Sequence, residues 1–185
     1  MIASTDLLAL MDKPLREAQP VGYKPSFMDL YRVYNTYTNR QDLREGIANE
    51  CAVRMSVALS LSGFSFETFA NRSRVQSGGR TGLPVAHVLG AQELAHYLRT
   101  VWGYPDRPGL GGSAAASIEG RLGVVYFNNC FKRAGETTNA GDHIDLWTGQ
   151  EYYNQILSLA AGVEDRSSTG NLFTKADAVW FWRLD

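Results

Sequence analysis

The chain has 185 residues, of which 44% are apolar and 20% charged, which predicts one folded domain and excludes a disordered chain. Lys and Arg number 18 against 19 Asp and Glu, so the net charge is -1. This charge provides no field that would gather nucleic acid or a membrane surface, and we expect neither as a partner. The N-terminal segment carries Asp6 and Asp12 among its apolar residues, so we expect neither a membrane anchor nor a signal peptide.

The first half of the chain has the spacing of amphipathic helices. Apolar and aromatic residues recur at helical intervals over residues 27–37, where Ser26 is the expected N-cap, and again over residues 91–102. A shorter apolar pattern precedes the prolines of the N-terminal segment. We expect residues 1–25 to form an appendage to one domain that covers residues 1–185.

A further helix is expected to be buried on all sides. The run from Cys51 to Leu61 is apolar nearly all round, which is typical of a helix inside a protein core. Asn49 is placed to cap its beginning, and Gly63 is placed to end it.

The second half of the chain changes to the pattern of strands. β-branched and aromatic residues, bounded by Gly or Asn, fill residues 122–131, 143–148 and 178–184. Residues 104–117 are rich in Gly and Pro and are expected to be irregular, whereas residues 152–161 are compatible with one more helix. Helices first and strands later predict an α+β domain, with the N-terminal helices packed on an antiparallel sheet.

Cys51 is a candidate nucleophile because it falls in the first turn of the expected buried helix. Unpaired backbone N–H groups and the helix dipole favour an anion there, so a thiolate is stabilised. The backbone N–H of Cys51 is also a candidate donor to an oxyanion. A small buried hydrophobic residue is the alternative interpretation of the same cysteine.

A histidine partner would favour the catalytic interpretation, and His143 is the candidate. It begins a predicted strand directly after a Gly-containing turn, a common place for a catalytic base. His87 and His96 are expected to be solvent-exposed or structural. The separation of Cys51 and His143 along the chain is a weak signal, because such residues meet in space rather than in sequence.

The second cysteine, Cys130, is expected to be a packed thiol, because its neighbours in the predicted strand are typical of a core. A metal site formed by Cys51, Cys130, His143 and Asp145 is chemically possible, but the spacing does not select it. We therefore expect no metal and no cofactor, and keep a metal-dependent hydrolase as an alternative.

Four motifs in order along the chain resemble those of the fourth family of type VI secretion amidase effectors. They are Asn49–Ser56 around the cysteine, Gly123–Phe127, Gly141–Trp147 around the histidine, and Val179–Trp182. The cysteine and histidine motifs together are far more specific than either alone.

The resemblance implies a papain-like cysteine peptidase fold and an amidase. The implied substrate is a peptidoglycan stem peptide, cut between γ-D-glutamate and meso-diaminopimelate. It also implies synthesis in the cytoplasm, export by the type VI secretion machine into the periplasm of a rival bacterium, contact with a component of that machine, and a cognate immunity protein in the producer. A non-catalytic binding or toxin module stays open as a different class of function.

The third member of a triad is where this sequence departs from the family. The family's usual Asp, eleven positions after the histidine, is replaced by Asn154 at the ungapped equivalent position. Papain-like enzymes often orient the imidazole with Asn, so Cys51, His143 and Asn154 are the expected triad. Asp145 is the rival, because a strand places it on the same face as His143. Candidates to steer the substrate's carboxylates are Arg72, Arg74 and Arg80.

Overall fold

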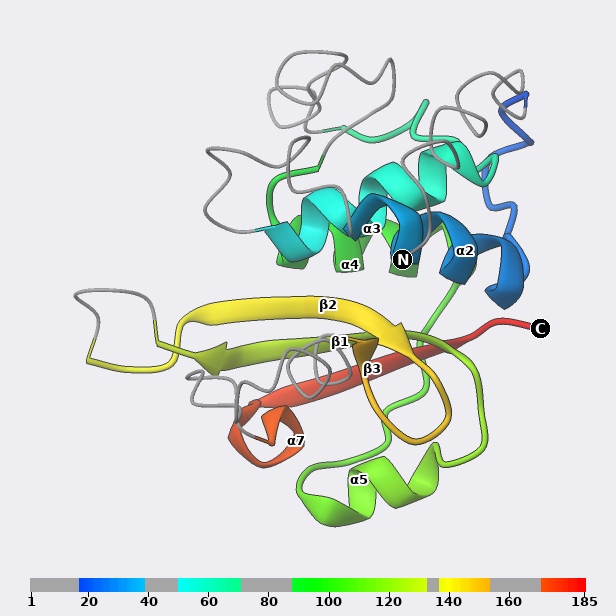
Figure 1. Cartoon of the computed structure of the whole chain (residues 1–185). Coiled ribbons are helices and arrows are strands. Elements are labelled where there is room, and N and C mark those ends of the chain that lie inside the picture. The colour runs from blue at the N-terminus through cyan, green and yellow to red at the C-terminus, as the bar shows by residue number, and fades with distance from the viewer. Residues whose placement is uncertain (1–16, 39–49, 71–87, 133–136, 154–170) are drawn as a thin grey trace. The chain divides into compact units, whose positions relative to one another are not determined.

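The computed structural model describes residues 17–38, 50–70, 88–132, 137–153 and 171–185 (Figure 1). The chain divides into two compact units, residues 1–90 and residues 91–185, which are treated one at a time below. One domain over residues 1–185, with residues 1–25 as an appendage, stays a prediction. Within the described ranges, no helix combines the length and the apolar character that crossing a membrane requires.

The first unit contains two helices in contact, α2 (Phe27–Thr38) and α3 (Glu50–Leu61). Ser26 caps α2, as predicted. Its hydroxyl oxygen accepts the Asp29 N–H at 3.2 Å and its hydroxyl donates to the Asp29 carboxylate at 2.9 Å. The two helices pack through a small apolar cluster formed by Tyr37, Val53, Val57 and the partly buried Leu61.

Helix α3 is buried along nearly its whole length, as its apolar sequence predicted. Every side chain from Cys51 to Leu59 is buried. The helix ends in a Schellman motif, in which the Phe64 N–H donates to the Leu59 carbonyl and the Gly63 N–H donates to the Ser60 carbonyl. Gly63 has φ +93°, a left-handed conformation that glycine adopts without strain, so the predicted end of this helix is confirmed. The predicted cap, Asn49, lies outside the described residues.

The second unit is built on a three-stranded antiparallel sheet in the order β2-β1-β3. Its strands are β1 (Gly123–Phe131), β2 (Gly141–Trp147) and β3 (Ala178–Arg183). All three were predicted, with ends that differ by at most two residues. Helices combined with an antiparallel sheet confirm the α+β prediction.

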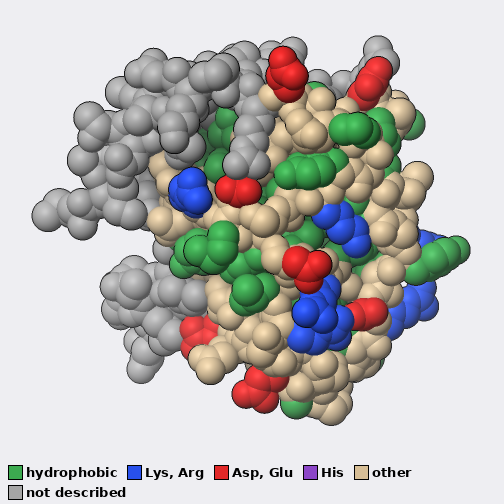
Figure 2. Space-filling view, turned by 90° about the vertical axis from the view of Figure 1, so that its right-hand side faces the viewer, with side chains coloured by type: hydrophobic (Ala, Val, Ile, Leu, Met, Phe, Trp, Pro, Cys, Tyr) green, Lys and Arg blue, Asp and Glu red, His purple; other side chains and the backbone are tan. Residues whose placement is uncertain are grey.

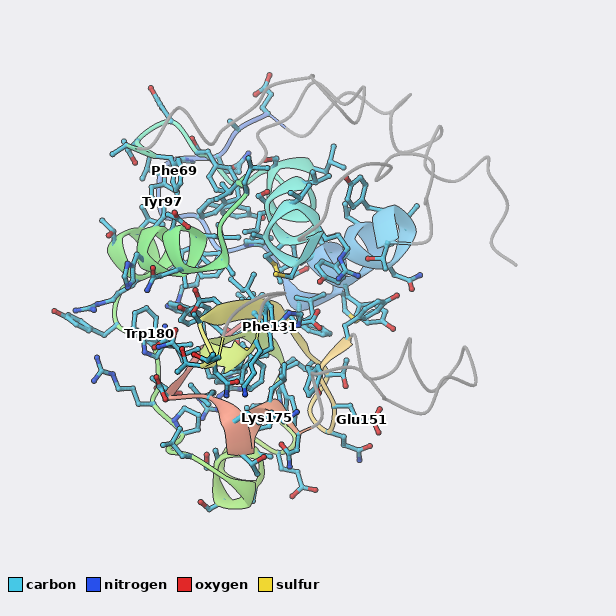
Figure 3. The ribbon with its side chains drawn as sticks, turned by 90° about the vertical axis from the view of Figure 1, so that its left-hand side faces the viewer. Phe69, Tyr97, Phe131, Glu151, Lys175 and Trp180 are labelled. Carbon is cyan, nitrogen blue, oxygen red and sulfur yellow. The ribbon has the colours of Figure 1, made fainter. Side chains whose placement is uncertain are left out.

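Helices lie on both faces of this sheet (Figure 1). Helix α4 (Ala91–Trp102) covers the face that carries Trp180 and Trp182, where the His96 ring lies 5.4 Å from the Trp180 ring. Figure 3 labels Trp180 beside this helix. The range predicted for α4 is confirmed, and His96 is exposed, as expected.

Two short helices, α5 (Gly112–Ser117) and α7 (Leu172–Lys175), cover the other face of the sheet. The prediction that residues 104–117 are wholly irregular was wrong, because α5 occupies their last six residues. Helices of four to six residues have too few turns to show a 3.6-residue period, so neither was visible in the sequence. Between these helices and the sheet lies the core of the unit, formed by Ala114, Ile118, Val125, Phe127, Cys130, Trp147, Tyr152, Leu172, Phe173, Ala176, Val179 and Phe181.

Charged side chains of both signs lie interspersed on the face of the molecule drawn in Figure 2. Arg121 pairs with Asp106 in the second unit, and Arg32 lies 3.8 Å from Asp29 one turn away on α2. This mixture of signs agrees with the net charge of -1.

Gly123, at the start of the central strand, leaves no room for a side chain. A Cβ there would lie 2.1 Å from the Trp182 carbonyl oxygen and 2.9 Å from the Phe181 ring. We predict that Gly123→Ala lowers the free energy of unfolding by about 1–3 kcal/mol, because the backbone of β3 must shift. The exposed Glu119→Ala is the control and should change it by less than about 0.5 kcal/mol. Equal melting temperatures for the two variants would contradict this account.

Candidate active site

Cys51 is the second residue of α3 and its thiol is buried, with 7% of the residue exposed. The first turn of a helix holds backbone N–H groups that no intrahelical carbonyl accepts, and they favour a negative charge. Arg54 lies three residues further on, so its Cβ is a near neighbour of Cys51 on the helix surface. It is also buried, with its guanidinium 6.0 Å from the Tyr34 ring centroid. A positive charge one turn away adds to the preference for a thiolate, and the sequence analysis had not singled out Arg54.

His143 is the third residue of β2 and is held between two aromatic rings. Its pairing partner on β1 is Phe127, whose ring lies 6.3 Å from the imidazole at 29°, and Tyr152 lies at the same distance edge-on. Only 5% of His143 is exposed. Paired strand residues share one face of the sheet, so the imidazole lies on the same face as the core around Phe127.

Asp145 contacts His143 directly. The two residues are separated by one position on β2, so their side chains share a face, and Asp145 Oδ2 lies 3.3 Å from His143 Nε2. The other carboxylate oxygen, Oδ1, accepts the backbone N–H of Leu146 at 2.9 Å. Asp145 is fully buried. The structure therefore brings together the histidine and one of the two candidates for the third residue.

The position of His143 depends on a break in the pairing of β1 and β2 beside it. The register runs regularly up to Phe127↔His143 and resumes only at Phe131↔Gly141, so β1 carries extra residues there. Asn129, in this bulge, has φ +50°, a left-handed conformation that Asn tolerates better than most residues. His143 is thus the regularly paired residue of β2 that lies next to the break.

The carboxylate of Asp142 holds this bulge. Its Oδ1 accepts the Asn129 backbone N–H at 3.0 Å, the Asn128 amide at 3.0 Å and the Tyr126 hydroxyl at 3.1 Å. Burial raises the pKa of Tyr126, and the negative charge of Asp142 raises it further, so the phenol stays protonated and remains a donor. The side chains of adjacent strand residues point to opposite faces, so Asp142 and His143 lie on opposite faces of the sheet.

Two further residues of the motif Gly141–Trp147 have clear packing roles. A Cβ at Gly141 would lie 2.3 Å from the ring of Phe131, which is labelled in Figure 3, so the ring needs a glycine beneath it. The Trp147 indole N–H donates to the Ile118 carbonyl at 2.9 Å and ties the end of β2 to the connection after α5.

Some of the other candidate residues lie among the described residues, and the rest fall outside them. Cys130 is fully buried in the core of the second unit, which confirms it as a packed thiol. Cys51 belongs to the first unit, so its pairing with His143 stays a prediction. Within the described ranges, no three or more His, Cys, Asp and Glu side chains form a group that could hold a metal ion. The candidates outside the described residues are His87, Asn154, Arg72, Arg74 and Arg80.

Comparison with protein families gives one match that covers most of the chain. The model of the family Tae4, described as type VI secretion system (T6SS) amidase effector protein 4, matches residues 47–182. This range contains Cys51, His143, Asp145 and Asn154. No curated protein matches the chain.

Solved structures with a similar fold include three of Tae4 proteins. The effector–immunity system Tae4/Tai4 from Salmonella typhimurium gives a TM-score of 0.60, with 17% sequence identity over 88% of this chain and 100% of that chain. The Tae4–Tai4 complex from Enterobacter cloacae gives 0.58 with the same identity and coverage. The Tae4 effector from Enterobacter cloacae gives 0.57, with 17% identity over 88% of this chain and 98% of that chain. At this identity the likeness shows a shared fold.

We predict that the bulge beside His143 depends on the carboxylate of Asp142. Asp142→Ala should lower the free energy of unfolding by about 1–3 kcal/mol in chemical denaturation, because the donors of Asn128 and Asn129 lose their acceptor. Asp177→Ala is the matched control, since that exposed carboxylate also accepts from Asn129, through the side-chain amide at 2.8 Å. A cost for Asp177→Ala equal to that for Asp142→Ala would contradict the role given to the partly buried contacts of Asp142.

Proposed function

The chain belongs to the T6SS amidase effector protein 4 family, and from this premise we propose that it hydrolyses peptidoglycan stem peptides with Cys51 as the nucleophile and His143 as the base. The scissile bond is the amide between γ-D-glutamate and meso-diaminopimelate. The observation that carries the proposal is the environment of His143, a buried imidazole whose Nε2 is held by a buried carboxylate. A base oriented by a third group is the arrangement that nucleophilic catalysis requires.

The reaction proceeds through an acyl-enzyme. His143 takes the proton of the Cys51 thiol, and the thiolate attacks the amide carbonyl carbon to form a C–S bond. The oxyanion accepts the Cys51 backbone N–H at the start of α3. As the C–N bond breaks, the imidazolium gives its proton to the departing amine. Water then attacks the thioester, His143 takes a proton from that water and returns it to the sulfur, and the carboxylate product leaves.

A papain-like fold in one domain accommodates this chemistry. Two features support it, namely a thiol in the first turn of a buried helix and a histidine on a strand of an antiparallel sheet. The protein needs no cofactor, because the thiolate supplies the nucleophile and the imidazole moves the protons.

Membership of the family supports the following biological setting. The effector is made in the cytoplasm of the producer, leaves through the type VI secretion machine with the help of one of its components, and cuts the wall in the periplasm of a target cell. The producer needs a cognate immunity protein. Two of the three solved structures described above are named as an effector–immunity complex or system, which supports this partner.

We predict that Cys51→Ala abolishes cleavage of purified muropeptides, because the proposed reaction has no other nucleophile. Mass spectrometry of the digest should show the wild-type products as one fragment ending in γ-D-glutamate and one with a new free amine on meso-diaminopimelate. The folded variant should give neither. Turnover by the folded Cys51→Ala protein would refute the cysteine mechanism, and products cut at another bond would refute the proposed specificity.

The reactivity of Cys51 distinguishes an enzyme from a non-catalytic binding module. In a Cys130→Ser background, where Cys51 is the only thiol, we expect rapid stoichiometric alkylation by iodoacetamide near neutral pH, followed by intact mass. His143→Ala in the same background should slow the alkylation if the imidazole takes the thiol proton. A thiol that is inert in both proteins would favour the binding module. The Cys130→Ser change itself should cost some stability, because it buries a hydroxyl in the core.

A further inference from the structure

We propose that Asp145 is the positioning residue for His143, and that His143 therefore exchanges protons with the thiol through Nδ1. The inference rests on the proposed function for the role of the thiol, but the pairing of Asp145 with His143 is tested separately from it below. It assigns the orienting role to the histidine's own strand instead of to Asn154, which lies outside the described residues.

The contact between the two side chains follows from the strand. Residues two positions apart on a strand have Cα atoms about 6.5 Å apart and side chains on one face. The imidazole and the carboxylate close that gap, and Nε2 and Oδ2 lie 3.3 Å apart. Pairing fixes both ends of this arrangement, because His143 is opposite Phe127 and Asp145 is opposite Val125 on the central strand.

Burial makes a proton on Nε2 the favourable arrangement. Asp145 is fully buried and His143 is 5% exposed, on a sheet face where Val125 and Phe127 supply only apolar side chains. A carboxylate in such surroundings is destabilised unless donors face it, and an N–H on Nε2 is such a donor. The neutral ring then carries its proton on Nε2, and Nδ1 holds the lone pair that a base needs.

A second hydrogen bond determines which oxygen faces the ring. The Leu146 N–H donates to Asp145 Oδ1 at 2.9 Å, so Oδ2 is the atom directed at the imidazole. In Asp145→Asn the same N–H keeps the amide oxygen at the Oδ1 position and leaves the NH₂ group facing Nε2. That NH₂ group is a donor, so the ring must accept at Nε2 and carry its proton on Nδ1. The substitution thus converts the base to the wrong tautomer with almost no change in shape.

The first experiment is ¹⁵N NMR of histidine-labelled full-length Cys51→Ala protein, at a pH above the titration of the His143 ring. Removing the thiol leaves a neutral ring, in which the protonated and unprotonated nitrogens have well-separated shifts. We expect the proton on Nε2. Adding Asp145→Asn should move it to Nδ1. A proton on Nδ1 without any change at Asp145 would overturn the proposal, and this measurement does not require the Asn variant to fold.

Asp142→Asn is the matched control for the loss of a charge beside His143. It removes a carboxylate from the adjacent residue, but that side chain lies on the opposite face and contacts β1. The tautomer of His143 should stay Nε2–H in this variant. The same shift of the proton in the Asp142 and Asp145 variants would mean that charge alone decides the tautomer, and would overturn the specific pairing.

The second experiment compares steady-state cleavage of muropeptides by four otherwise wild-type variants. Asp145→Asn should fold, as judged by circular dichroism, and lose at least about 100-fold in kcat with little change in KM, because a wrong tautomer leaves geometry and binding intact. Asp145→Glu, which keeps a carboxylate, should retain more activity than Asp145→Asn. Asn154→Ala and Asn154→Asp should both stay within about tenfold of wild type. A crippled Asn154→Ala beside a nearly normal Asp145→Asn would assign the role to Asn154.

The two proposals can fail separately. If Cys51→Ala stays active while the NMR result is as expected, the cysteine mechanism is wrong and the Asp145–His143 pair stands. If Cys51→Ala is inactive while the ring proton lies on Nδ1, the amidase mechanism stands and the positioning role of Asp145 is wrong.

Discussion

The three hydrogen bonds accepted by the Asp142 carboxylate bridge the break in the pairing of β1 and β2. The central strand β1 pairs with both β2 and β3. At a break in the β1–β2 pairing, a slip of β2 by one residue would exchange the two faces of that strand. The carboxylate closes the break by accepting the Asn129 backbone N–H, which the interrupted pairing leaves without a strand partner, and it also accepts the Asn128 side-chain amide. Everything before the break, including Phe127↔His143 and Val125↔Asp145, is therefore held in one register.

The motif Gly141–Trp147 is a strand, so its side chains alternate between the two faces of the sheet, and packing residues and candidate catalytic residues occur side by side along it. Side chains at its odd positions share the face with the core around Phe127, and those at its even positions face α4. The buried His143 and Asp145 lie between Gly141, which accommodates an aromatic ring, and Trp147, which is tied to the Ile118 carbonyl. The imidazole is thus held by packing on both sides along its strand, which suits a group that must keep its orientation through several proton transfers.

Much of the fold follows from local signals. Helices α2, α3 and α4 have clear periodicity or continuous apolar character, and Ser26 and Gly63 mark their ends as the general rules for caps require. The short helices α5 and α7 were missed because four to six residues show no period. The bulge was also missed, although the pair Asn128-Asn129 inside a β-branched and aromatic run is a signal for it, since Asn accepts a left-handed conformation.

The candidate site was predictable only in part. Alternation along a strand put His143 and Asp145 on one face, but whether two side chains bridge the distance between their Cα atoms depends on rotamers set by packing. The resemblance to the family directed attention to Asn154 instead. Helical spacing alone places Arg54 one turn from Cys51. Its burial beside Tyr34, in contrast, could not be derived from the sequence.

The four tryptophans of the chain all lie in the second unit, at positions 102, 147, 180 and 182, and all are buried. Their intrinsic fluorescence is therefore a reporter of residues 91–185 alone, whereas the first unit, with its tyrosines on α2, is spectroscopically silent at wavelengths that excite only indole. An unfolding curve recorded by indole emission measures the half of the chain that carries His143. The accessibility of the Cys51 thiol to a reagent measures the other half, so the two signals together reveal whether the halves unfold as one.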